Sequence, residues 1–131
     1  MRRESAFTRV GVVGVSAGVL IAVRVALLVL PYAAASRAAA RWTRRSAWLP
    51  AQPADRIARR VERLARYVPG ATCLPQAWAA VILLAWHGHR ATVKLGVRKD
   101  GSVLRAHAWV EHQGTVIIGG DVKDFVAFES R

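Results

Sequence analysis

The spacing of apolar residues changes once along this chain, near residue 90. Over residues 55–68 the apolar positions recur every three or four residues, and residues 73–86 form an Ala-rich apolar run too long for a strand, so both segments are predicted to be helices. Residues 92–98 and 103–111 instead alternate apolar with polar, and a third short strand is predicted at 115–118. The pattern predicts an α+β fold in which helices precede a three-stranded antiparallel meander.

The first 54 residues are predicted to be helical and carry no direct sign of a function. Arg24 interrupts the apolar run over residues 10–23 after 14 residues, short of the about 20 that a membrane span needs. A core-packed or surface-lying helix is the prediction, with membrane insertion and a cleaved signal as alternatives. Residues 33–48 are expected to form an Ala- and Arg-rich helix and 50–53 a linker, so the expected division is an N-terminal segment, 1–54, and a core domain, 55–131.

Charge is distributed unevenly along the 131 residues, whose formal net charge is +12. Residues 1–68 contain 13 Arg against three acidic residues, a net charge of +10, whereas residues 69–131 carry only +2. Because the candidate chemistry lies in the second half, nucleic acid is not the expected partner. The single cysteine permits no internal disulfide and fits the cytoplasm, with membrane association through residues 10–30 left open.

Cys73 is the first candidate for chemistry because it stands at the start of a predicted helix. The Pro at position 75 is tolerated only in a first helical turn, which fixes that start. The exposed N–H groups of a helix N-terminus stabilise a thiolate, the reactive form of cysteine. The competing interpretation is that Cys73 is a small buried hydrophobic residue, so a partner side chain has to decide between the two.

His107 is the expected partner. It lies in the middle of a predicted strand, where an imidazole has no packing advantage over Val or Thr. A helix-borne cysteine followed about 30 residues later by a strand-borne histidine is the chain order of papain-like and transglutaminase-like folds. His87, His89 and His112 lie at a helix end or a turn and are expected to be solvated. A zinc site of Cys73, His87 and His89 matches no standard ligand spacing, so no metal or other cofactor is expected.

A third residue should orient the imidazole. A turn at Gln113-Gly114 pairs His107 with Gly120, whereas one extra residue, as a longer loop or a bulge at Gly119-Gly120, places Asp121 opposite His107. Asp121 is therefore the predicted orienting residue. Its alternatives are Asp124, Glu111, and a merely structural role for Asp121 at the end of the strand.

The two faces of the predicted sheet differ in character. A turn at Asp100-Gly101 places Ala108 and Val110 on one face, which is the more apolar, and His107 and Trp109 on the other. If Cys73 and His107 act together, the helix at 73–86 has to cover the His107 face. The N-terminal helices then cover the apolar face, in a three-layer arrangement with the sheet in the middle.

These motifs together resemble a known family. The segments are Thr72-Cys-Leu-Pro-Gln-Ala, then Gly88, then residues 93–97 ending in Gly-Val, then Ala106-His-Ala-Trp-Val-Glu followed by Gly114. Over residues 55–128 the chain resembles the stand-alone leader peptidase of lasso-peptide biosynthesis, a transglutaminase-like cysteine protease. The resemblance implies a catalytic helix packed on an antiparallel sheet, with Cys73 as nucleophile and His107 as base.

The resemblance also implies a substrate and partners. The substrate is a ribosomally synthesised precursor peptide, bound with the help of a separate leader-recognition protein, and the product goes to an ATP-dependent cyclase. The family's aspartate follows its histidine by about a dozen residues, which falls here on Gly119, two positions before Asp121. Two other function classes are weighed beside the protease: a transglutaminase-like acyltransferase and a non-catalytic basic binding module.

Overall fold

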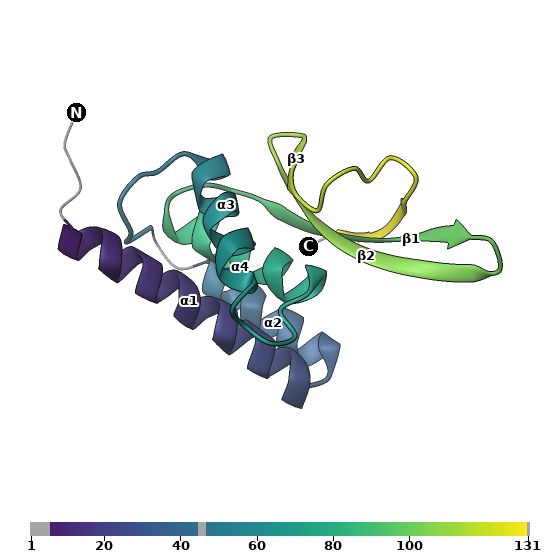
Figure 1. Ribbon diagram of the computed structural model, residues 1–131, viewed down its shortest axis with the longest axis horizontal. Helices are drawn as coiled ribbons and strands as arrows, with labels where there is room; N and C mark the ends of the chain where they lie inside the picture. The colour runs from purple at the N-terminus through teal and green to yellow at the C-terminus, as the bar shows by residue number, and fades with distance from the viewer. Residues whose placement is uncertain (1–5, 45–46, 131) are drawn as a thin grey trace.

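The computed structural model describes residues 6–44 and 47–130 (Figure 1). In this part of the chain it contains four helices followed by four strands: α1 (Ala6–Val29), α2 (Tyr32–Thr43), α3 (Ala54–Ala65), α4 (Cys73–Trp86), β1 (Thr92–Asp100), β2 (Val103–His112), β3 (Thr115–Ile118) and β4 (Val126–Ser130). The α+β class and the order of helices before strands are confirmed. Figure 1 shows the helices gathered at one end of the molecule, with the β1–β2 hairpin extending beyond them.

The first helix is longer than its apolar run suggested. Arg24 does not end α1, because its guanidinium turns out of the helix and its Nε donates to the backbone carbonyl of Pro69, at 3.2 Å. By length and composition, Arg9–Val29 could cross a membrane, but a core helix or an N-terminal signal sequence passes the same test. One side of α1 packs on α3 and α4. The buried residues on that side are Val12, Ser16, Val19, Leu20 and Val23.

The sheet has the strand order β3-β2-β1-β4, so it contains one strand more than the predicted meander. The first hairpin closes at Asp100 and Val103, one residue later than predicted, and every cross-strand partner therefore shifts by two. A shift of two keeps each side chain on its predicted face. The second turn is at Gln113-Gly114 as predicted, and both residues have positive φ, 51° and 78°, as the favoured two-residue hairpin turn requires.

The prediction of which face the catalytic helix covers is wrong. The buried side chains of α4 form one cluster with Ala108 and Val110 of β2 and with Val93 of β1. Helix α4 therefore lies on the apolar face, opposite His107. It contacts α1, α2 and α3 on its other sides, so α4 and not the sheet is the middle layer. This position explains why α4 is apolar along its whole length, since a helix that is hydrophobic all round is buried on all sides.

The His107 face is covered by chain rather than by a helix. The segment between β3 and β4 passes over it and brings Phe125 against Trp109, with ring centroids 6.2 Å apart. Trp109 is buried there, and its ring also lies over Gly96 of the neighbouring strand, where a Cβ would come within 2.7 Å of it. This second, smaller packing group is separate from the main core.

The main core draws on both halves of the predicted division. Val19, Leu20 and Val23 of α1 belong to the same buried cluster as α4 and the sheet. The linker before α3 is also fastened to α4, since the N–H groups of Trp48 and Leu49 both donate to the Trp86 carbonyl, at 3.0 Å. The division at residue 54 stays a prediction.

Candidate active site

Cys73 is the first residue of α4, as predicted, and its thiol is free and partly buried at the edge of the main core. The preceding Thr72 makes no side-chain cap, and Pro75 has no N–H to offer. The first turn of a helix has no carbonyls of its own for its N–H groups. The N–H groups of Cys73 and Leu74 therefore face out of the helix end, beside the sulfur, where they can meet a negative charge.

The loop before Cys73 is held by three neighbouring elements. The Pro69 carbonyl accepts from Arg24 of α1, and the Ala71 N–H donates to Val68 at the end of the preceding segment, at 3.1 Å. The Ala71 carbonyl accepts from the Gln76 amide of α4, at 2.8 Å. Gly70, with a φ of 77°, lies against the Arg24 guanidinium, in space that a side chain would occupy. These contacts hold the loop, and with it the Cys73 end of α4, against α1.

His107 lies on β2, half-buried, in a cluster of three rings with Phe125 and Trp109. Its ring centroid is 5.1 Å from that of Phe125 and 6.1 Å from that of Trp109. Its Nε2 is 2.8 Å from the carbonyl oxygen of Gly119. A carbonyl oxygen only accepts, so Nε2 carries the proton in this contact and Nδ1 is left as the basic nitrogen.

Gly119 is suited to this contact by its backbone. Its φ is 116°, a region that L side chains rarely adopt. A Cβ on it would stand 2.5 Å from the Trp109 Cβ and 3.3 Å from His107 Nε2. The strand pairing explains how the carbonyl arrives there. A bulge between Val110 and Glu111 brings Ile118 opposite Val110, after which the chain leaves the sheet at Gly119.

The bulge has the predicted effect on register but lies two residues earlier than Gly119-Gly120. Continued past its last pair, the ladder would set Asp121 opposite His107, but the strand ends first. The Asp121 side chain is 69% exposed, and its Oδ1 accepts from the backbone N–H of Lys123, at 3.1 Å. The structure does not bring this carboxylate to the imidazole.

The two alternative carboxylates have other surroundings. Glu111 shares the His107 face, but its Oε2 accepts from Trp109 Nε1, at 3.0 Å, and its Oε1 lies 3.7 Å from Lys94 Nζ. Glu111 thus holds the indole that flanks His107 rather than His107 itself. Asp124 is exposed on the segment between β3 and β4.

The remaining histidines lie at the other end of α4 or on the hairpin. His87 is buried, so its prediction as a solvated residue is wrong, because the linker before α3 folds over the end of α4. Its Nδ1 contacts the Pro50 carbonyl, and His89 Nε2 contacts the Gln52 carbonyl. The 14 residues of α4 separate Cys73 from both, about 20 Å at 1.5 Å per residue. These three residues therefore cannot share one metal ion.

No hydrogen bond joins Cys73 to His107 among the described residues of the free protein. Helix α4 is on the apolar side, and the imidazole faces the segment between β3 and β4. The β3 ladder ends at Val110 and Ile118, so beside His107 the edge of β2 has no strand next to it. The Gly119 carbonyl, rather than a strand, lies against the imidazole there.

The sequence did not identify the Gly119 carbonyl as the hydrogen-bond partner of His107. Two signals pointed to it: the family spacing of about a dozen residues after His107, and the Gly119-Gly120 pair. It also missed Phe125, which β4 and the preceding turn bring to the site from far along the chain.

Comparison with known proteins places the chain in a family. Neither a curated protein nor a solved structure matches it. The model of the transglutaminase-like superfamily matches residues 17–130, which includes most of α1 and every later element. The helix-borne cysteine, the strand-borne histidine and this match agree, and the chain belongs to the transglutaminase-like superfamily.

Proposed function

We propose that this protein is a cysteine peptidase that removes the leader from a lasso-peptide precursor. The superfamily includes cysteine proteases and acyltransferases. Cys73 supports a catalytic role because it is the first residue of α4, with the N–H groups of the helix end beside its sulfur. The A-H-A-W-V-E motif around His107 favours the leader peptidases among these enzymes.

Each step of the proposed reaction has a group on this chain. His107 Nδ1 takes the proton of the Cys73 thiol, the thiolate attacks the scissile carbonyl carbon, and the Cys73 N–H donates to the oxyanion that forms. Collapse of this intermediate breaks the C–N bond, and the His107 imidazolium gives its Nδ1 proton to the leaving amine. His107 then takes a proton from water, whose oxygen attacks the thioester and releases the acid and the thiol.

The mechanism requires the Cys73 sulfur to come within hydrogen-bond reach of His107 Nδ1 when the precursor is bound. Because the imidazole points away from the face on which α4 packs, this approach requires the start of α4 or the segment over His107 to move when the precursor binds. The Gly119 carbonyl supports this role of His107, because it accepts from Nε2 and leaves Nδ1 as the base. Asp121, predicted as the orienting residue, is the competing candidate, and its substitution separates the two.

In this role the protein acts in the cytoplasm, where the precursor is synthesised. Its proposed partners are the precursor peptide, a separate leader-recognition protein and the ATP-dependent cyclase that uses the new N-terminal amine. The acyltransferase is the second candidate because the superfamily includes this activity. The two differ only in what attacks the thioester, water or an amine.

The deciding experiment incubates the full chain with precursor and leader-recognition protein in ¹⁸O-labelled water, followed by mass spectrometry. We expect cleavage with one ¹⁸O in the leader carboxylate. The Cys73→Ala variant should lose at least about 10³-fold in rate, and iodoacetamide should have the same effect through the chain's single thiol. An unlabelled amide product would assign the acyltransferase. Equal turnover by Cys73→Ala would exclude both.

A further inference from the structure

The side of α1 that faces away from the other helices is apolar and exposed. We call this the outer face of α1. Its large side chains are between 43% and 71% exposed, and helical spacing places them along one side. They are Val10, Val13, Ile21, Val25, Leu28 and Val29. Large apolar side chains exposed together along one side of a helix mark a surface that something else covers.

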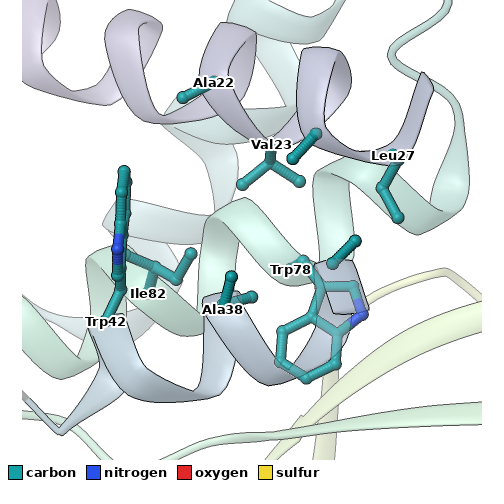
Figure 2. Close-up of a pocket in the computed structure, with 10 residues that line it drawn as sticks. Ala22, Val23, Leu27, Ala38, Trp42, Trp78 and Ile82 are labelled. Carbon is teal, nitrogen blue, oxygen red and sulfur yellow. The ribbon is translucent and has the colours of Figure 1, made fainter. Parts of the chain in front are cut away.

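The partner that covers the outer face of α1 also has to suit the side chains on its two flanks. On one flank, α1, α2 and α4 line an open apolar pocket of about 110 Å³, whose lining includes Val23, Leu27 and Trp42 (Figure 2). Trp42 is half-exposed at this pocket, and the neighbouring Arg41 is exposed. An indole beside an arginine on an apolar surface is the pairing found where a protein meets the headgroup region of a bilayer.

The other flank has the same composition. Arg24 reaches from α1 to the Pro69 carbonyl, which brings the loop between α3 and α4 alongside the outer face. That loop presents Arg66 and Tyr67, and Tyr67 is 83% exposed, the highest value among the exposed large hydrophobic side chains. Aromatic and guanidinium groups therefore stand on both sides of the apolar face.

We propose that the outer face of α1 docks on the surface of a membrane rich in anionic phospholipid, with α1 lying in the plane of the headgroups. Charge favours this occupant over a second copy of the chain. Residues 1–68 carry a net charge of +10, so two copies meeting through this half repel, whereas anionic headgroups attract it. An apolar face with flanking arginines is the composition of helices that lie in the bilayer interface.

The packing of α1 favours lying on the bilayer over crossing it. Five of its side chains are buried against α3 and α4, and Arg24 is hydrogen-bonded to the loop before Cys73. A crossing helix would expose the apolar side of α4 that α1 covers and would carry Arg24 into hydrocarbon. Docking in the plane of the headgroups keeps both the packing of α1 on α4 and the hydrogen bond from Arg24 to Pro69.

The test uses the full chain and vesicles, with binding measured by co-sedimentation. We expect binding to vesicles of equal parts anionic and zwitterionic phospholipid, and at least about tenfold weaker binding to zwitterionic vesicles. Leu28→Glu should weaken binding to anionic vesicles by about tenfold or more, because the side chain no longer enters the bilayer. Leu104→Glu is the matched control, since Leu104 and Leu28 are 69% and 68% exposed but Leu104 lies on the distant hairpin.

Three results would overturn the proposal. They are absence of binding to anionic vesicles, equal binding to zwitterionic ones, and equal losses in Leu28→Glu and Leu104→Glu. Sedimentation velocity tests the other occupant: a dimer of the wild type that Leu28→Glu dissolves would assign this face to a second copy. Circular dichroism of both variants confirms that each is folded. Vesicle binding is measured without peptidase activity, so its result tests the docking surface independently of the proposed reaction.

Discussion

The two faces of the sheet are covered by different kinds of structure. Helix α4 lies on one face and buries Ala108 and Val110 completely, with α1 behind it. The other face carries His107 under a short irregular segment that contributes Phe125. Neighbouring residues of one strand thus have separate tasks. Side chains on the helix-covered face belong to the main core, whereas the other face carries the smaller packing group of Trp109 and Phe125 and the proposed base, His107.

The largest expected effect is the loss of activity in His107→Ala. We expect kcat/KM for precursor cleavage to fall by about 10³-fold, because the general base and acid is removed. The free energy of unfolding should change little, since the imidazole lies outside the main core. His112→Ala is the control on the same strand, because His112 contacts the Arg90 carbonyl and the His89 ring and touches neither Gly119 nor Phe125 in the described contacts. Similar losses of kcat/KM in both variants would contradict a specific role for His107.

Gly119→Ala should come next, with a loss in kcat/KM of about 10²-fold. The added Cβ meets the Trp109 Cβ and approaches His107 Nε2, so the carbonyl that orients the imidazole has to move. Gly120→Ala is the matched control, with a φ of 71° but nothing within 4 Å of its Cβ. ¹⁵N NMR of the wild type should show the His107 proton on Nε2. A proton on Nδ1 would refute the orienting role of Gly119.

On the helix-covered face, Val110→Ala should lower the free energy of unfolding by about 2 kcal/mol, because it leaves a cavity beside α4. Val103→Ala, at an exposed position of the same strand, should change it by less than about 0.5 kcal/mol. Urea denaturation measures both. Steady-state kinetics of Val110→Ala at a temperature where it is folded should match the wild type. A large loss of activity there would show that the two faces are coupled.

The smallest expected effect belongs to Asp121→Asn. If the Gly119 carbonyl orients His107, we expect kcat/KM to change by less than about threefold, a difference within ordinary surface-substitution effects. An aspartate that orients a catalytic histidine costs about 10⁴-fold when it becomes asparagine. A loss of that size would therefore assign the role to Asp121 and would require the segment between β3 and β4 to rearrange when the precursor binds.

The helices, the hairpin and its two faces could be predicted from the sequence because they depend on local spacing. The face that α4 covers could not, because alternation groups Ala108 with Val110 without showing what packs on them. The requirement that Cys73 meet His107 suggested the wrong face. Burial decided it, because an all-apolar helix packs on the side that removes most apolar surface from water.

Non-local pairing was the other source of error. Strand β4 pairs with β1, about 30 residues earlier, and a five-residue strand gives little periodic signal on its own. The site residues likewise divide into those that local patterns predict and those that depend on non-local pairing. Cys73 was predictable from the helix start and His107 from its place on a strand, but the Gly119 contact depends on a bulge whose position no local pattern gives.

A backbone oxygen beside His107 has a consequence for how the site responds to acid. An aspartate in this place gains a proton as the solution is acidified and then no longer accepts from the imidazole in the same way. The Gly119 carbonyl has no such titration, so it holds the ring across the whole acidic range. Being neutral, it also attracts an imidazolium less than a carboxylate would. The orientation of this histidine is thus set by the path of the main chain, and the carbonyl that sets it is not protonated as the solution is acidified.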